Sequence, residues 1–306
     1  MSDSPFVLGG APGRPGPGAL PAALLRALQI DVGRRIEGML AGEFRSSRLG
    51  DGAELAQVRP YVPGDDVRML EWNVTARTGI PHVRVHLAER VLVTWLVLDV
   101  SQSMQFGTAD RRKADVAAGV ALAIGHVATR RGNRLGVLTF GGSEDTTLPP
   151  AQGRHGLIGL LTALREEPEG VGTGSTSLGA ALSRTAATAR QRGLVVVVSD
   201  FRGPLDWRGP LLQLLPRHDV LAVEVRDPRE QELPDVGEVW LVDPETGRQV
   251  RVDTGSRLLR ERFAVAAAEE RTGVARVLSA LAVPHGVLST EGDWLRAFAV
   301  FLRGRR

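Results

Sequence analysis

The chain has 306 residues and 43% apolar content, which is enough for one large domain with a sizeable core and an additional segment. It contains no cysteine, which excludes disulfides, thiolate metal sites and cysteine nucleophiles. The formal net charge is only +3, and the arginines are interspersed with Asp and Glu, so we expect no nucleic-acid partner.

The sequence carries no signal for a membrane location. No apolar run approaches the roughly 18–20 residues that a membrane helix needs, and residues 1–6 lack the basic and apolar regions of a secretory signal. We therefore expect a soluble, cytoplasmic protein with no membrane span.

The first 90 residues predict two segments. Residues 1–20 are so rich in glycine and proline that we expect a disordered tail. Residues 21–90 predict a smaller extension, which starts with an amphipathic helix from 21 to about 40 and continues as a charged, β-rich stretch. Within that stretch, residues 81–87 alternate apolar and polar side chains as a strand does.

From residue 91 to 306, predicted strands and helices alternate. This pattern favours an α/β fold, a doubly wound and mostly parallel sheet flanked by helices. The predicted strands are 91–98, 135–140, 194–198, 220–225, 239–242, 249–252 and 286–289, of which 239–242 and 249–252 form a hairpin. The predicted helices are 110–131, 156–165, 177–190, 209–215, 256–282 and a last one from 294.

Oxygen-bearing side chains follow two of the buried strands. Asp99, Ser101 and Ser103 come after the strand 91–98, and Asp200 comes after the strand 194–198. A Gly/Ser/Thr-rich loop also leads into the predicted helix 177–190. Such loops meet at the carboxyl edge of a doubly wound sheet, and their carboxylate and hydroxyl oxygens suit Mg²⁺ or a similar divalent cation.

Each of these groups also has a purely structural explanation. Ser, Thr and Asp are common where a strand gives way to a turn or a helix begins. Thr176 or Ser177 could cap the helix that follows, and Asp200 could begin a turn. The occurrence of three such groups in the right order favours the metal site.

The arrangement resembles the metal-ion-dependent adhesion site (MIDAS) of von Willebrand factor A domains, over about residues 92–303. The positions that match its ligands are Asp99, Ser101, Ser103, Thr176 and Asp200, with Thr173 as the alternative to Thr176. The resemblance implies a von Willebrand factor A-like fold and a bound Mg²⁺ (or Mn²⁺ or Ca²⁺). One coordination position would stay open for an acidic side chain of a partner.

The preceding stretch narrows the resemblance. The sequence R-x-Y-x-x-G-D-D-x-R at 59–68, followed by Trp72 and by T-A-R at 75–77, is similar to the signature of the bacterial domain of unknown function 58 family. Glu71 stands where that family usually has Asp. Genes of the family often lie beside those of MoxR-type AAA+ ATPases. The resemblance implies a non-catalytic adaptor or co-chaperone that works with such an ATPase or its client.

The charges of this signature allow two interpretations. The three arginines and three acidic residues could form an ion-pair network that fixes the extension to the main domain. Alternatively, the stretch could be a docking surface for a partner. The candidate partner-binding residues are Arg59, Asp65, Asp66, Arg68, Trp72 and Arg77. We expect Trp72 and Tyr61 to be packing anchors.

The sequence contains none of the common catalytic motifs. It lacks a P-loop, a G-x-S-x-G nucleophile elbow and H-E-x-x-H. The enzyme alternative is a phosphohydrolase or phosphoacceptor that uses Asp99 as nucleophile. A phosphatase would need a second carboxylate where Ser101 stands, and a receiver-type domain would need a lysine later than Lys113. We therefore expect no enzyme.

Overall fold

The structure is a computed structural model of the chain. It describes residues 13–23, 25–26, 49–87, 91–130, 132–164, 177–242 and 248–304. The chain divides into two compact units, of which the smaller covers Glu37–Val91 and the larger the rest. Within the described ranges, no helix combines the length and the apolarity needed to cross a bilayer.

The smaller unit is built on an antiparallel strand pair. The pair is β1 (Leu49–Pro60) and β2 (His82–Leu87), joined through the 3-10 turn η1 (Val67–Met69) and the short helix α2 (Trp72–Thr78). The alternating stretch 81–87 therefore contains the predicted strand. Helix α2 was not predicted because its seven residues carry no apolar stripe. Most of the predicted helix 21–40 lies outside the described residues.

Six strands of the larger unit form one sheet in the order β10-β7-β6-β3-β4-β5. Their bounds are β3 (Val93–Asp99), β4 (Arg134–Phe140), β5 (Thr147–Gln152), β6 (Gly193–Ser199), β7 (His218–Arg226) and β10 (His285–Ser289). All neighbours are parallel except β5, which pairs antiparallel with β4. The sequence did not predict β5, whose prolines Pro149 and Pro150 are tolerated because the strand lies at the sheet edge.

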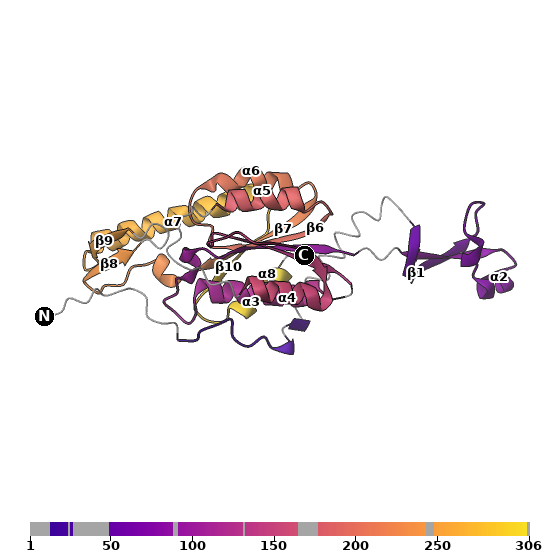
Figure 1. The fold of residues 1–306 in the computed structure, drawn as a ribbon, viewed down its shortest axis with the longest axis horizontal. Coiled ribbons are helices and arrows are strands. Elements are labelled where there is room, and N and C mark those ends of the chain that lie inside the picture. Colours follow the sequence, from indigo (N-terminus) through magenta and orange to yellow (C-terminus); the bar gives the residue numbers. More distant parts are fainter. Residues whose placement is uncertain are drawn as a thin grey trace. The chain divides into compact units, whose positions relative to one another are not determined.

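Helices cover both faces of this sheet, which confirms the predicted doubly wound α/β fold (Figure 1). On one face lie α3 (Lys113–Ala128), α4 (Gly153–Ala163) and α8 (Trp294–Arg303), and on the other α5 (Leu178–Thr188), α6 (Arg208–Leu214) and α7 (Arg257–Ala280). Three 3-10 turns are η2 (Gln102–Gln105), η3 (Leu205–Trp207) and η4 (Pro228–Glu230). The predicted hairpin is present as β8 (Glu238–Val242) and β9 (Gln249–Asp253).

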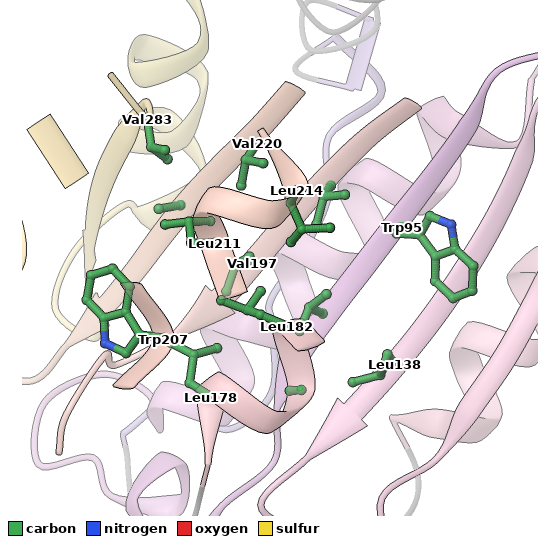
Figure 2. Close-up of a cluster of buried hydrophobic side chains, with 14 of the residues drawn as sticks. Trp95, Leu138, Leu178, Leu182, Val197, Trp207, Leu211, Leu214, Val220 and Val283 are labelled. Atoms are coloured by element: carbon green, nitrogen blue, oxygen red, sulfur yellow. The ribbon is translucent and has the colours of Figure 1, made fainter. Parts of the chain in front are cut away.

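The packing of the core explains why the sequences of the central strands are unbroken apolar runs. Every residue of β3 and β6 is buried, since helices pack on both sides of them. On the α5 and α6 face, Trp95 and Val197 of the sheet pack into one cluster with helix residues such as Leu182 and Leu211 (Figure 2). The strands that carry the candidate site are thus held rigidly.

The chain direction across the sheet reverses between β3 and β6. From β3 the chain continues outward to β4 and β5, whereas from β6 it continues outward to β7 and β10. Ligands of open α/β sheets bind at the carboxyl ends of strands beside such a reversal. Asp99 ends β3 and Asp200 follows β6, so both lie at this point.

The described part of the glycine- and proline-rich N-terminal stretch differs from the disordered tail that its composition indicated. Arg14 N donates to the Asp110 carbonyl at 2.7 Å, and the Arg111 side chain donates to the Arg14 and Gly16 carbonyls. Trp294 Nε1 donates to the Pro17 carbonyl at 3.1 Å. These contacts hold the stretch against the rest of the larger unit: its carbonyls accept from Arg111 and Trp294, and its Arg14 amide donates to the Asp110 carbonyl.

Candidate metal site

The loop after β3 arranges three oxygen-bearing side chains within one short turn. Asp99 Oδ1 accepts a hydrogen bond from the Ser101 amide at 3.0 Å, which folds the chain back directly after the strand. The hydroxyls of Ser101 and Ser103 lie 3.0 Å apart. Asp99 Oδ2 accepts from Ser199 Oγ at 2.6 Å, so the end of β6 helps to hold the Asp99 carboxylate.

The turn after β6 brings Asp200 to the same place. Ser103 Oγ donates to Asp200 Oδ2 at 2.8 Å, across 97 residues of sequence. Phe201 adopts a left-handed backbone with φ of 54°, which is uncommon for a bulky residue and costs on the order of 1–3 kcal/mol. Its ring packs edge-on against Trp207 at 5.6 Å. Packing therefore stabilises the backbone conformation that presents Asp200.

Four of the five predicted ligand residues thus converge. Asp99, Ser101, Ser103 and Asp200 form one hydrogen-bonded cluster. The fifth position, Thr176 or its alternative Thr173, lies outside the described residues. The next residue along the chain is Ser177, whose hydroxyl caps α5 through the Ala180 amide at 3.1 Å. Ser177 thus has the capping role that the structural explanation allowed for it.

A buried lysine completes the cluster, and the sequence analysis did not predict its role. Lys113 Nζ donates to Asp200 Oδ2 at 2.7 Å and to Glu230 Oε1 at 2.6 Å. The lysine side chain is fully buried. One sequence signal was present: Lys113 stands three residues before Val116 and seven before Val120, so helical spacing places it on the buried stripe of α3.

Burial and charge shift the pKa values of this cluster in different directions. Burial, reinforced by the nearby charge of Asp200, raises the pKa of Asp99 to about 7. Burial also favours a higher pKa for Asp200, but the ammonium of Lys113 outweighs it and leaves the Asp200 pKa lowered. For Lys113, burial acts to lower the pKa, and the carboxylates of Asp200 and Glu230 outweigh it and raise the pKa. The lysine is therefore charged.

The donor set fits a small, oxygen-seeking divalent cation. Magnesium in proteins takes six oxygens at about 2.0–2.1 Å, so adjacent ligand oxygens lie roughly 3 Å apart. The oxygen separations found here are 3.0 Å for Ser101 to Ser103 and 2.8 Å for Ser103 to Asp200. Among the described residues, no group of three or more His, Asp or Glu side chains is placed to hold a metal. The oxygens that converge here come from two hydroxyls and two carboxylates.

A third carboxylate at the same sheet edge has only neutral hydroxyl and amide donors as partners among the described residues. Asp227, directly after β7, accepts from Thr108 Oγ1 at 2.6 Å, Thr108 N at 2.8 Å, Thr290 Oγ1 at 2.7 Å and Arg229 N at 2.9 Å. Burial acts to raise the Asp227 pKa, but these hydrogen bonds outweigh it and the pKa is lowered. The sequence analysis missed Asp227, although D-P-R-E at 227–230 is a capping-box pattern.

In the smaller unit, the acidic pair of the signature is used locally. Arg59 binds Asp65 through two hydrogen bonds of 2.7 Å each, and Asp65 also accepts from the Val62 amide. The Arg59 hydrogen bonds are the main cause of the lowered pKa of Asp65. Asp66 caps η1 by accepting from the Arg68 amide at 2.9 Å. The arginine of this cap is exposed, with its Nε 3.8 Å from Asp66.

One expectation for the rest of the signature is wrong, and one ion pair lies outside the proposed network. Glu71 pairs with Arg84 on β2, because the bridge between Leu70 and Val83 brings Glu71 beside that strand. The hydrogen bond from Arg84 lowers the pKa of Glu71. Trp72 is 68% exposed and is no packing anchor, since it occupies the first turn of α2 on the solvent side. Tyr61 is partly buried.

Comparison with solved structures finds distant likenesses. A conserved hypothetical protein BatB from Bacteroides thetaiotaomicron has a TM-score of 0.46 at 14% identity, covering 70% of this chain and 98% of that one. A von Willebrand factor type A structure from Catenulispora acidiphila has a TM-score of 0.37 at 11% identity, covering 72% and 43%. Both scores are below 0.5, so the fold assignment rests on the topology of this chain.

Sequence relatives are much closer. The uncharacterized protein Rv1480 of Mycobacterium tuberculosis is 42% identical over 290 residues, covering 93% of this chain and 90% of that protein. The uncharacterized protein Mb1516 of Mycobacterium bovis has the same identity and coverage. The family model described as "Protein of unknown function DUF58" matches residues 57–273. The chain therefore belongs to the DUF58 family.

Proposed function

We propose that the larger unit is a non-catalytic, divalent-cation-dependent module for protein–protein interaction. Asp99, Ser101, Ser103 and Asp200, with Thr176 or Thr173, hold Mg²⁺ (or Mn²⁺ or Ca²⁺). The ion supplies a Lewis-acidic position that an acidic side chain of a partner can occupy. The observation that carries this proposal is the 2.8 Å contact between Ser103 and Asp200, which joins the β3 and β6 loops at ligand spacing.

The hydroxyls and the carboxylates of the site have different roles. Ser101 and Ser103 contribute neutral hydroxyls, which leave the ion strongly electrophilic. Asp99 and Asp200 contribute charge and orient those hydroxyls. With so few carboxylates, the affinity for the ion alone is expected to be modest, with a Kd on the order of 10⁻⁴–10⁻³ M. A carboxylate from a partner would then raise the affinity for the ion and fix the partner at the same time.

The partner in this proposal is a MoxR-type AAA+ ATPase or its client, and the chain is its adaptor or co-chaperone in the cytoplasm. A second contact surface is available on the smaller unit. Trp72 is exposed, and the side chain of Arg68 is 88% exposed. Aromatic and arginine side chains are the residue types that carry most binding energy in protein interfaces. This surface would bind the partner without the metal.

The geometry does not favour the enzyme alternative. A nucleophilic Asp99 would need an accessible, ionised oxygen. The residue is 4% exposed, and both of its carboxylate oxygens already accept hydrogen bonds. Its pKa, raised to about 7 by burial, also reduces the ionised fraction. Lys113 contacts Asp200 and not Asp99.

Calorimetric titration of the full chain with MgCl₂ and MnCl₂ tests the proposal. We expect saturable binding that Asp99→Asn reduces at least tenfold, because the variant removes one of the two charges next to the hydroxyls. Asp219→Asn is the matched control, since Asp219 is exposed at the amino end of β7, away from the cluster at the carboxyl ends of the strands. Equal binding by the wild type and by Asp99→Asn would reject the proposed function.

The partner is tested separately. The purified MoxR-type ATPase of the same organism should bind the wild type more tightly in the presence of Mg²⁺ than after addition of EDTA. Trp72→Ala should weaken binding in both conditions, because its surface does not involve the metal. Binding that is insensitive to EDTA and to Asp99→Asn would show that the candidate metal site is not the interface.

A further inference from the structure

Lys113 is the one lysine of the chain, and it is placed inside the candidate metal site. The side chain is fully buried, although lysine is rarely buried without paired charges. Its ammonium bridges Asp200 Oδ2 at 2.7 Å and Glu230 Oε1 at 2.6 Å. A positive charge thus already sits on the carboxylate that a divalent cation would use.

The hydrogen bonds of Asp200 show what the ammonium competes for. Oδ2 accepts from both Lys113 and Ser103, and Oδ1 accepts from the Arg202 amide at 3.1 Å. A carboxylate oxygen has two lone pairs, so Oδ2 is fully engaged. Direct ligation of an ion by this oxygen requires that the bond from Lys113 or the bond from Ser103 be given up.

The other carboxylate of Lys113 fixes the ammonium in this position. Glu230 Oε1 also accepts from Arg202 Nη1 at 3.1 Å, and Glu230 Oε2 accepts from the Asp227 amide at 3.2 Å. Both oxygens of Glu230 are therefore held. Because Glu230 belongs to the capped turn η4, Lys113 cannot follow a displaced Asp200 without breaking this second pair.

We propose that Lys113 is the positioning residue that sets the divalent-cation affinity of this site. Its ammonium holds Asp200 in an outer position and repels the incoming ion, so that stable binding requires the additional carboxylate of a partner. The inference rests on the proposed function of the site. It adds a specific cause for weak binding of the ion alone and for cooperative binding of ion and partner.

The first test compares Mg²⁺ affinity in the wild type and in Lys113→Met, which keeps an unbranched side chain one atom shorter and removes the charge. We expect the variant to bind Mg²⁺ at least tenfold more tightly, because Asp200 becomes free and a repulsive charge is lost. Equal or weaker binding by the folded variant, with a wild type that does bind, would overturn the inference and leave the proposed function intact.

A paired comparison covers the case in which Lys113→Met does not fold. The double variant Lys113→Met/Glu230→Gln removes one positive and one negative charge together, so the buried site keeps its net charge. Its reference is Glu230→Gln, which retains the ammonium on Asp200. We expect the double variant to bind Mg²⁺ at least fivefold more tightly than Glu230→Gln. Equal affinities of the two would overturn the inference.

A spectroscopic measurement reads Lys113 directly. Labelling with [¹⁵N]lysine gives a single side-chain ammonium signal, because the chain has one lysine. On addition of MgCl₂ we expect this signal to shift with the same midpoint as the calorimetric titration, and at a correspondingly higher MgCl₂ concentration in Asp99→Asn. Saturable heat without any change of the Lys113 signal would overturn the inference alone.

The remaining case separates the two proposals. If the wild type binds no Mg²⁺ but Lys113→Met does, the inference is supported, since the ammonium then suppresses binding by itself. If neither the wild type, nor Lys113→Met, nor the double variant binds Mg²⁺ or Mn²⁺, the proposed function fails and the inference fails with it.

Discussion

Two carboxylate clusters lie at the same edge of the sheet, at the ends of the neighbouring strands β6 and β7. The carboxylates of the two clusters accept hydrogen bonds from different kinds of donor. Asp227, after β7, is surrounded by neutral hydroxyl and amide donors. Asp200, after β6, has a charged partner, Lys113, and a hydroxyl partner, Ser103, which is itself a candidate ligand. The first cluster is closed, whereas the second contains groups that a cation can use.

The difference teaches how one sheet edge can combine stability with binding. Asp227 connects Thr108, in the loop after η2, to Thr290, after β10, so it holds the loops around the site in place. Its lowered pKa shows that the surroundings favour the ionised form. The pKa of Asp99 in the candidate site is raised, so the surroundings of Asp99 disfavour the ionised form of its carboxyl group. A divalent cation would remove that disadvantage.

The largest expected effect is the loss of the closed cluster. Asp227→Ala leaves the buried hydroxyl of Thr290 and the partly buried donors of Thr108 and Arg229 without this acceptor, and charge-assisted hydrogen bonds contribute about 1.5–3 kcal/mol each. We expect the free energy of unfolding to fall by roughly 3–5 kcal/mol, measured by urea denaturation. The loss should be the same with and without Mg²⁺. If Mg²⁺ restored the lost stability, Asp227 would belong to the metal site, and the two carboxylate clusters would not have separate roles.

The pH dependence of the same residue gives a smaller effect. Because the folded-state pKa of Asp227 is lowered below its usual value of 3.8, its contribution is present above that pH and is lost as the pH falls through the folded-state value. Asp227→Asn should therefore cost about 2 kcal/mol at pH 6 and distinctly less near pH 3. Denaturant titrations of both proteins at the two pH values measure this. A constant difference would contradict the lowered pKa.

How much of this could be predicted from sequence depends on the range of the contacts. The apolar runs that became β3 and β6 predicted the central strands, since a strand buried on both faces leaves that pattern. D-x-S-x-S at Asp99 and the aspartate after β6 predicted that these side chains lie together, and the structure joins them by hydrogen bonds. Lys113 was missed because its two carboxylates are 87 and 117 residues away, and only the fold brings them together.

In the smaller unit, prediction was limited even though the interacting residues lie close in sequence. Its signature residues lie close in sequence, and the pair Arg59–Asp65 was among the predicted possibilities. The partner of Glu71 is Arg84, which the signature does not include, because Arg84 lies on β2, 13 residues later. The exposure of Trp72 could not be predicted, since a seven-residue helix gives too little periodicity to distinguish a buried face from an exposed one.

A single hydroxyl of the closed cluster should matter less than its carboxylate. Thr290→Val removes one hydrogen bond to Asp227 and preserves shape. We expect a loss of about 1–2 kcal/mol in the free energy of unfolding and no change in Mg²⁺ affinity. Urea denaturation and calorimetry on the same preparation check both. A change in Mg²⁺ affinity above threefold would show that the two clusters are coupled through the loops they share.

The corresponding change in the other cluster should affect Mg²⁺ affinity strongly and stability little. Ser103→Ala removes a candidate ligand that is partly exposed, so the free energy of unfolding without metal should change by less than about 1 kcal/mol. The Mg²⁺ affinity should fall by roughly tenfold, equivalent to about 1.4 kcal/mol. Ser183→Ala is the matched control, because the Ser183 hydroxyl bonds only to the Gly179 carbonyl within α5 in the described structure. Ser103→Ala could instead behave like Thr290→Val, with a loss of stability and unchanged Mg²⁺ affinity. Both clusters would then be structural, and Ser103 would not be a ligand of the metal.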